Sequence, residues 1–216
     1  MPAMNDIIQT ITVYAIPVIF AITLHEAAHG YVAKYFGDAT AFLQGRVSLN
    51  PLKHVDPIGT IVIPLVLALL PFGFVFGYAK PVPVNFENLR NPKRDMIWVA
   101  LAGPAANLLQ AFLWVGIGSI VEVFDPSESY FTRVVQAGVI VNCVVFAFNL
   151  IPVPPLDGGR IVMGLLPDRA AHSYSRIEPY GFFIVMGLVA FGLLGVWMGP
   201  IVGGLLLFFN SLAAIL

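Results

Sequence analysis

Charged side chains are scarce in this chain of 216 residues. Asp, Glu, Lys and Arg make up 11% of it, against about 25% in a soluble globular protein. Hydrophobic residues make up 58%, and the mean hydropathy is +0.86. This composition excludes an ordinary soluble domain and predicts a polytopic membrane protein, for which the lipid bilayer is the main solvent. The formal net charge of −1 says nothing about partners. For a chain of this composition we expect no nucleic-acid partner.

Cysteine is also nearly absent. Cys143 is the only one, so no disulfide can form within the chain. The N-terminal stretch Met1–Asp6 lacks the basic side chains that begin a signal peptide. We therefore expect the first apolar stretch to remain in the mature protein.

Long apolar stretches divide the chain. A helix needs about 20 residues to cross a bilayer, and stretches of sufficient length lie at about residues 7–36, 96–121 and 131–151. A last stretch, at about residues 180–216, is too long for one crossing. Gly195, Gly199 and Pro200 predict a hairpin of two short helices there.

A further stretch, at about residues 58–70, is apolar but too short to cross, and prolines bound and interrupt it. The stretch Gly77–Asn85 follows. Its Pro81 and Pro83 have no backbone N–H, so we expect an extended edge element or a loop rather than a helix. The sequence thus predicts a short re-entrant or extended, β-like element around residues 58–85.

These stretches together predict the fold class. We expect an all-α polytopic integral membrane protein with about five to six transmembrane helices. It should form a single membrane-embedded domain over residues 1–216, with a core at about residues 7–160 and the helical hairpin at its C-terminus.

The stretch His25-Glu26-Ala27-Ala28-His29 lies inside the first apolar helix. Positions i and i+4 share a helix face, so His25 and His29 can present two imidazoles to one metal ion. Glu26 stands beside the first ligand, where it can hold and deprotonate a water molecule that the metal activates. A solvated face is the alternative, but this face would lie in lipid, where an ionisable group usually marks function.

A catalytic zinc takes three protein ligands and keeps one position open. Asp157 is the favoured third ligand, because few acidic residues lie against apolar segments and this one follows the helix-breaking run Pro152–Pro155. Alternatively, Asp157 closes a Pro-Gly turn at the membrane surface. His54, in a polar loop, is a rival ligand, and His172 is a weaker one.

Helix directions test this choice. Asp157 can share a metal with the histidines only if the segments at 7–36 and 131–151 run in the same direction. The segment at 96–121 supplies one full crossing between them. The segment at 58–70 should therefore re-enter or lie shallow, as its length and prolines also indicate.

The basic residues favour the same arrangement. If residues 58–70 return to their own side, ten of the eleven Lys and Arg residues lie on the side of the metal site, and Arg133 lies opposite. The positive-inside rule then places the site toward the cytoplasm and the N-terminus outside. We expect a multi-pass protein of the plasma or inner membrane of the cell.

Three motifs in this order resemble the signatures of the site-2 proteases, the intramembrane zinc metalloproteases of peptidase family M50. They are His25–His29, Gly103–Asn107 and Asn149–Gly159. The stretch Gly77–Asn85 and the compact length are similar to a small prokaryotic branch without a PDZ domain. The resemblance covers roughly residues 7–160.

This resemblance implies one zinc ion per chain, bound by His25, His29 and Asp157, with Glu26 as the catalytic acid and base. It implies a zinc metalloendopeptidase that hydrolyses peptide bonds within or near transmembrane segments of other membrane proteins, as in regulated intramembrane proteolysis. Further residues are expected to contact substrate: Asn107, Asn149, Tyr78 and Lys80. The Tyr78–Val84 segment would hold an unwound substrate by edge pairing, or serve only in re-entrant packing.

Other functions stay open at this point. The same ligands would serve a non-proteolytic membrane zinc protein, such as a transporter, a sensor or an inactive scaffold. A different membrane zinc peptidase, acting on soluble or lipid-modified chains, is a further alternative. The substrate, the need for a prior cut and a homo-oligomeric state are left open by the sequence.

Overall fold

The computed structural model describes residues 4–63, 66, 77, 79–124 and 130–215, and every regular element in these ranges is helical. The predicted all-helical class is confirmed. The elements are α1 (Met4–Phe36), α2 (Thr40–Leu43), η1 (Pro51–Lys53), η2 (Pro57–Val62), η3 (Phe86–Asn88), α4 (Pro92–Phe124), α5 (Tyr130–Asn149), α6 (Asp157–Leu165), α7 (Asp168–Ser175), η4 (Glu178–Tyr180), α8 (Gly181–Ala190) and α9 (Leu193–Ala213).

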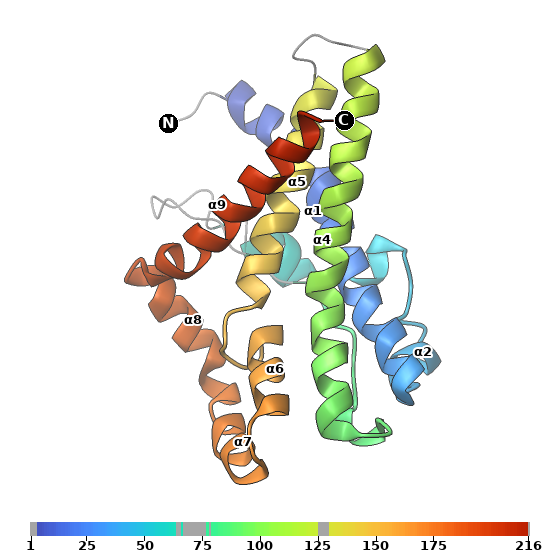
Figure 1. Ribbon diagram of the computed structural model, residues 1–216, viewed down its shortest axis with the longest axis vertical. Helices are drawn as coiled ribbons and strands as arrows, with labels where there is room; N and C mark the ends of the chain where they lie inside the picture. Colours follow the sequence, from blue (N-terminus) through green and yellow to red (C-terminus); the bar gives the residue numbers. More distant parts are fainter. Residues whose placement is uncertain (1–3, 64–65, 67–76, 78, 125–129, 216) are drawn as a thin grey trace.

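Helices α1, α4 and α5 pack against one another and form the centre of the bundle. Figure 1 shows that α1 and α5 run in the same direction and that α4 runs in the opposite one. This is the relative direction of the first and fourth apolar segments that sharing a metal requires.

Close packing between α4 and α5 depends on a small residue. A Cβ on Gly138 would lie 2.2 Å from Cδ2 of Trp114, so the indole ring covers the glycine backbone directly. Helix α9 packs onto the same pair of helices. There Phe209, 1% exposed, joins a buried apolar cluster with Ala111, Val139 and Cys143. These contacts fix the register of α4, which carries part of the site described below.

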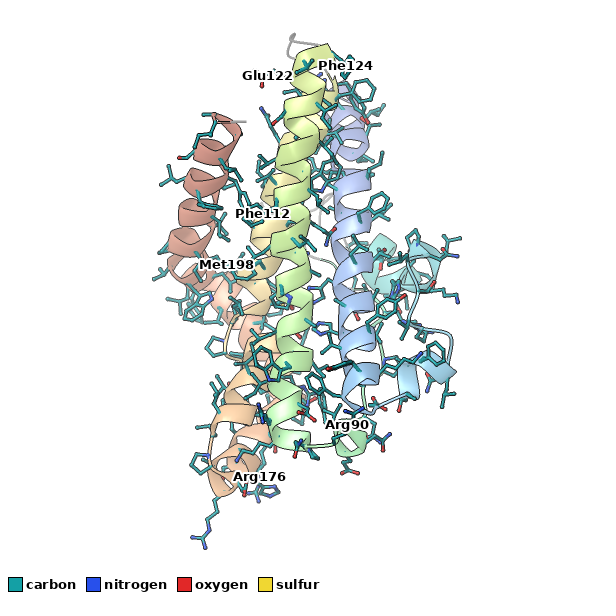
Figure 2. The ribbon with its side chains drawn as sticks, turned by 45° about the vertical axis from the view of Figure 1, so that its right-hand side comes forward. Arg90, Phe112, Glu122, Phe124, Arg176 and Met198 are labelled. Carbon is teal, nitrogen blue, oxygen red and sulfur yellow. The ribbon has the colours of Figure 1, made fainter. Side chains whose placement is uncertain are left out.

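Four helices among the described residues are long and apolar enough to cross a membrane: Ile8–Phe36, Pro92–Phe124, Tyr130–Asn149 and Leu193–Ala213. Large apolar side chains cover their outer faces, including Phe20, Leu113 and Phe208. Such a surface is costly in water and suits lipid. The chain is therefore a membrane protein, with charged ends visible in Figure 2 at Arg90, Arg176 and Glu122.

The C-terminal apolar stretch divides into α8 and α9, which meet at an angle in Figure 1. The break falls at Phe191–Gly192, where Gly192 has φ +69°. This conformation is open to glycine at little cost. Pro200 lies inside α9, so the chain breaks before the residues that we expected to break it. Helix α8, with ten residues, is too short to cross a bilayer alone.

Helices α1 and α4 meet where one ends and the other begins. The N–H of Arg90 donates to the carbonyl of Phe36 at 2.9 Å. Asp38, which is fully buried, accepts hydrogen bonds from the backbone N–H of Asn85 at 2.7 Å and the amide of Asn88 at 3.1 Å. The connection between α1 and α4 therefore starts and ends at the same end of the bundle.

Part of the predicted 58–85 element is described. It begins with η2, a short π-helix whose first N–H groups are capped by the Asp56 side chain. Residues 79–85, here named the extended segment, form no helix and pair in no strand with any described residue, and the backbone of Asn85 is extended. Most of the predicted element between these two parts lies outside the described residues.

Candidate metal centre

Helix α1 places two imidazoles on one face, toward the inside of the bundle. His25 is 5% exposed and His29 is 9% exposed. Their rings meet edge to face with centroids 4.7 Å apart, and their Nε2 atoms are 3.0 Å apart. The i and i+4 spacing in the sequence accounts for this pairing.

Hydrogen bonds at the opposite ring nitrogens define the histidine tautomers. His29 Nδ1 lies 2.7 Å from the Val99 carbonyl, which can only accept. His25 Nδ1 lies 2.7 Å from Asn107 Oδ1, while the Asn107 amide donates to the Ala21 carbonyl and to Asn142. Both Nδ1 atoms therefore carry the proton, and both Nε2 atoms keep a free electron pair for a ligand bond.

Asp157 reaches the histidines from the first residue of α6. A tight turn brings it there. A Cβ on Gly158 would lie 2.4 Å from the Leu150 carbonyl oxygen, and a Cβ on Gly159 would lie 2.3 Å from the Pro154 nitrogen. The chain can fold back so closely only because both residues lack a side chain.

The three candidate ligand atoms lie close together. Asp157 Oδ2 is 3.2 Å from His25 Nε2 and 3.3 Å from His29 Nε2. It is buried and has no hydrogen-bond partner among the described residues. A tetrahedral zinc with bonds of about 2.0–2.1 Å separates its ligand atoms by about 3.3 Å. The donor set and its spacing therefore fit a zinc ion with one position left open.

Helix α4 approaches the two histidines at a glycine. A Cβ on Gly103 would lie 2.4 Å from His29 Nε2 and 2.5 Å from His25 Cε1. No other residue type fits at this position without displacing an imidazole. Because Asn107 lies one helical turn further along α4, the same approach brings its amide to His25.

Glu26, on α1, lies next to the candidate ligand His25 in the sequence and is half-buried. Its Oε2 accepts a hydrogen bond from the backbone N–H of Val82 at 2.7 Å. One carboxylate oxygen is therefore held by the extended segment that precedes η3. A carboxylate beside a zinc site is the group that such sites use to move protons.

The structure separates the rival ligands from this cluster. Of the described residues, His25, His29 and Asp157 form the group that could hold a metal. The His54 ring is buried, and its Nε2 pairs with the Ser48 carbonyl at 2.8 Å. His172 is exposed, and its Nε2 lies near the guanidinium of Arg176.

The residues predicted to contact substrate have different surroundings. The Asn107 side chain is fully buried and serves His25. Asn149 is half-buried at the end of α5 and donates to the Val145 carbonyl. The Lys80 side chain is exposed, and Tyr78 lies outside the described residues.

Sequence reasoning overlooked several functional neighbours. Asn142 is fully buried and accepts from Asn107 at 2.9 Å. Its polar side chain within an apolar helix was a usable signal, because such a group requires a partner. The roles of the Val99 carbonyl and the Val82 N–H left no direct signal in the sequence, since every residue carries a carbonyl and every residue except proline carries an N–H.

Comparisons with known proteins identify relatives of this chain. The model of peptidase family M50 matches residues 114–192, which include Asp157. "Putative zinc metalloprotease YwhC" of Bacillus subtilis is 38% identical over 193 residues, which are 84% of this chain and 83% of the relative. "Putative zinc metalloprotease Rip2" of Mycolicibacterium smegmatis is 30% identical over 85% of this chain and 69% of the relative. No solved structure matches.

A bundle of membrane-length helices around a buried candidate metal site of two histidines and one aspartate fits the class of membrane zinc metalloproteases. The identity to YwhC, over most of both proteins, shows that the chain belongs to peptidase family M50. Zinc is its cofactor, and its activity is that of an intramembrane zinc metalloprotease.

Proposed function

We propose that this protease hydrolyses peptide bonds within or near the transmembrane segments of other membrane proteins. One observation carries the proposal: the candidate zinc ligands His25 and His29 lie in the second half of a membrane-spanning helix. A site at that depth meets substrates that are themselves in the bilayer. A soluble peptide would have to leave water to reach it.

In this proposal His25, His29 and Asp157 hold one zinc ion through the atoms that lie 3.0–3.3 Å apart. Zinc, when bound, polarises the scissile carbonyl and lowers the pKa of water toward about 7. Glu26 accepts a proton from the attacking water and later gives it to the leaving amine. Asn107 and the Val99 carbonyl keep the two imidazoles in the ligating tautomer.

The substrate must lose its helix before it is cut. In an α-helix each carbonyl accepts from the N–H four residues on, so the scissile carbonyl is engaged and shielded. Lys80, exposed in the extended segment, and Asn149, at the end of α5, are candidates for contacting the unwound chain. Tyr78 is a candidate from the sequence alone.

We also propose a topology. Ten of the eleven Lys and Arg residues would lie toward the cytoplasm, together with the zinc site. Figure 2 supports a division of this kind, with Arg90 and Arg176 at one end and Glu122 at the other. The connection that starts and ends at one end of the bundle favours four crossings, with residues 58–85 as a re-entrant element, over the predicted five to six.

A designed substrate tests the proposal. The probe is a synthetic Leu/Ala transmembrane peptide of about 25 residues with a central Gly-Pro break and a fluorophore and quencher at its ends. Zinc-loaded enzyme in lipid nanodiscs should cut this probe and should cut an unbroken control peptide much more slowly. A Glu26→Gln variant should keep its zinc and lose cleavage. Equal cleavage by this variant, or cleavage of soluble peptides alone, would overturn the proposal.

A further inference from the structure

We infer that the backbone N–H of Val82 is a positioning group for the Glu26 carboxylate, and that Arg46 keeps that N–H in place. The inference rests on the proposed function, in which Glu26 carries the proton. It gives a specific task to the extended segment at residues 79–85, which is separate from binding substrate.

The hydrogen bond itself is well defined. The N–H of Val82 donates to Glu26 Oε2 at 2.7 Å, across 56 residues of sequence. Pro81 and Pro83 on either side have no N–H to offer. Val82 is therefore the single possible backbone donor among these three residues, and the segment presents it to Glu26.

Packing fixes Val82 against the helix that carries Glu26. The Val82 side chain is 7% exposed. A Cβ on Gly30 would lie 3.1 Å from Val82 Cγ1, so the valine rests on the bare backbone of that glycine. Gly30 is four residues after Glu26 and shares its face of α1. The side chain and the N–H of Val82 thus contact successive turns of the same helix.

Arg46 fastens the segment on the N-terminal side of Val82. Its Nη2 donates to the carbonyl oxygen of Lys80 at 2.9 Å and to that of Pro81 at 3.2 Å. The Lys80 N–H in turn donates to the His54 carbonyl at 2.9 Å. A guanidinium that bridges consecutive carbonyls restrains the peptide unit that carries the Val82 N–H.

Asp38 holds the segment on the C-terminal side of Val82. Its carboxylate accepts from the N–H of Asn85 at 2.7 Å, and it stands just beyond the last residue of α1. The segment is therefore tied on both sides of Val82 to residues of the connection that follows α1. An N–H held this firmly can restrict the rotation of a glutamate side chain, which is otherwise free in several rotamers.

The Glu26 carboxylate therefore has one oxygen, Oε2, held by the Val82 N–H, and its other oxygen is available for proton transfer. Orientation of a catalytic group contributes strongly to rate, and loss of a neighbour that orients a metal-site residue typically costs about 10–100-fold in activity. We expect a loss of this size in kcat when the Val82 N–H is removed, with KM and zinc content unchanged.

The sharpest test removes only the N–H. Incorporation of the α-hydroxy analogue of valine at position 82 replaces the amide N–H by an ester oxygen and keeps the side chain. The same exchange at Val84 is the matched control, because the Val84 N–H has no hydrogen bond to any described residue. Val82→Pro is the genetically encoded version, with Val82→Ala as the variant that keeps the N–H and loses packing.

Each protein is measured as zinc-loaded enzyme in nanodiscs on the Gly-Pro probe. The expected result is a fall in kcat of about 10–100-fold for the ester at position 82 and for Val82→Pro, and a change of less than about threefold for the ester at position 84. An unchanged kcat at position 82 overturns the inference. A rise in kcat overturns it too and shows an inhibitory contact, and a change in KM alone shows a substrate-binding edge.

Arg46 gives an independent measurement. Arg46→Ala removes both hydrogen bonds that Nη2 donates to the Lys80 and Pro81 carbonyls, and we expect an intermediate fall in kcat. Adding Arg46→Ala to the ester at position 82 should lower kcat no further, and additive losses contradict the inference. Wild-type enzyme that fails to cut the probe counts against the proposed function, whereas wild-type cleavage with a normal ester variant counts against this inference alone.

Discussion

The Nδ1–H of His25 donates to Asn107 Oδ1 at 2.7 Å, and Asn107 is completely buried. Its amide donates in turn to Asn142 and to the Ala21 carbonyl. This polar chain crosses from α1 through α4 to α5 inside an apolar bundle. An unpaired polar group at such depth is costly, so each member of this chain depends on its partner. The orientation of His25 is therefore linked to the packing of α1, α4 and α5.

Replacing Asn107 should therefore weaken zinc binding. In Asn107→Ala, His25 loses the acceptor that orients it, and we expect about 10–100-fold lower zinc affinity in a chelator competition. Asn107→Asp keeps an acceptor for His25 and should retain more affinity. Asn149→Ala is the control, because that side chain bonds only within α5 among the described residues. Equal affinity in wild type and Asn107→Ala would show that the contact does not orient the ligand.

Gly103→Ala should disrupt the site by volume alone. The added methyl group would stand within 2.4–2.6 Å of atoms of His25 and His29. We expect less zinc per chain in the purified protein by elemental analysis. Gly116→Ala, in the same helix with nothing within 4 Å of the new methyl, should bind zinc normally and gain up to about 1 kcal/mol in helix stability. Normal zinc content in Gly103→Ala would mean that α4 is not so close to the histidines.

Asp38 should make stability depend on acid pH. Burial alone would raise its pKa, but hydrogen bonds from Thr40, Asn85 and Asn88 lower the pKa below the ordinary 3.8. A lowered folded-state pKa adds stability that is complete above about pH 4 and is lost as pH falls through the folded pKa. Bonds to a buried carboxylate contribute about 1.5–3 kcal/mol each at most.

The matching variant is Asp38→Asn, which cannot titrate. It should melt at a lower temperature than wild type at pH 7, and the difference between the two should shrink as the pH falls below 4. Thermal unfolding in detergent over this pH range measures the effect. A difference that stays constant with pH would show that the carboxylate charge does not stabilise the connection between α1 and α4.

The sequence was informative where chemistry is tied to short spacing. The His25–His29 spacing indicated a shared face, and the direction of the helices favoured Asp157 over His54 as their partner. Charge and hydropathy were enough to predict an all-helical membrane protein, because a backbone in lipid must satisfy its hydrogen bonds internally, as an α-helix does.

The sequence was uninformative where contacts depend on helix register and on backbone groups. Asn107 was predicted to contact substrate, which stays a prediction, but its hydrogen bonds with His25, Ala21 and Asn142 were not foreseen. Which way such a side chain points depends on how α4 packs on α1, which no local pattern encodes. The position of the break at Gly192 could not be predicted either, since several glycines in that stretch are equally able to end a helix.

Zinc content in single-ligand variants tests the central claim most directly. The wild type should contain one zinc ion per chain, with nitrogen and oxygen ligands and no sulfur in its X-ray absorption spectrum, because Cys143 packs in the core between α4, α5 and α9. His25→Ala, His29→Ala and Asp157→Ala should each lose most of the zinc, while Glu26→Gln and His54→Ala keep it. Full zinc occupancy in Asp157→Ala, or a sulfur ligand in the wild type, would contradict the account.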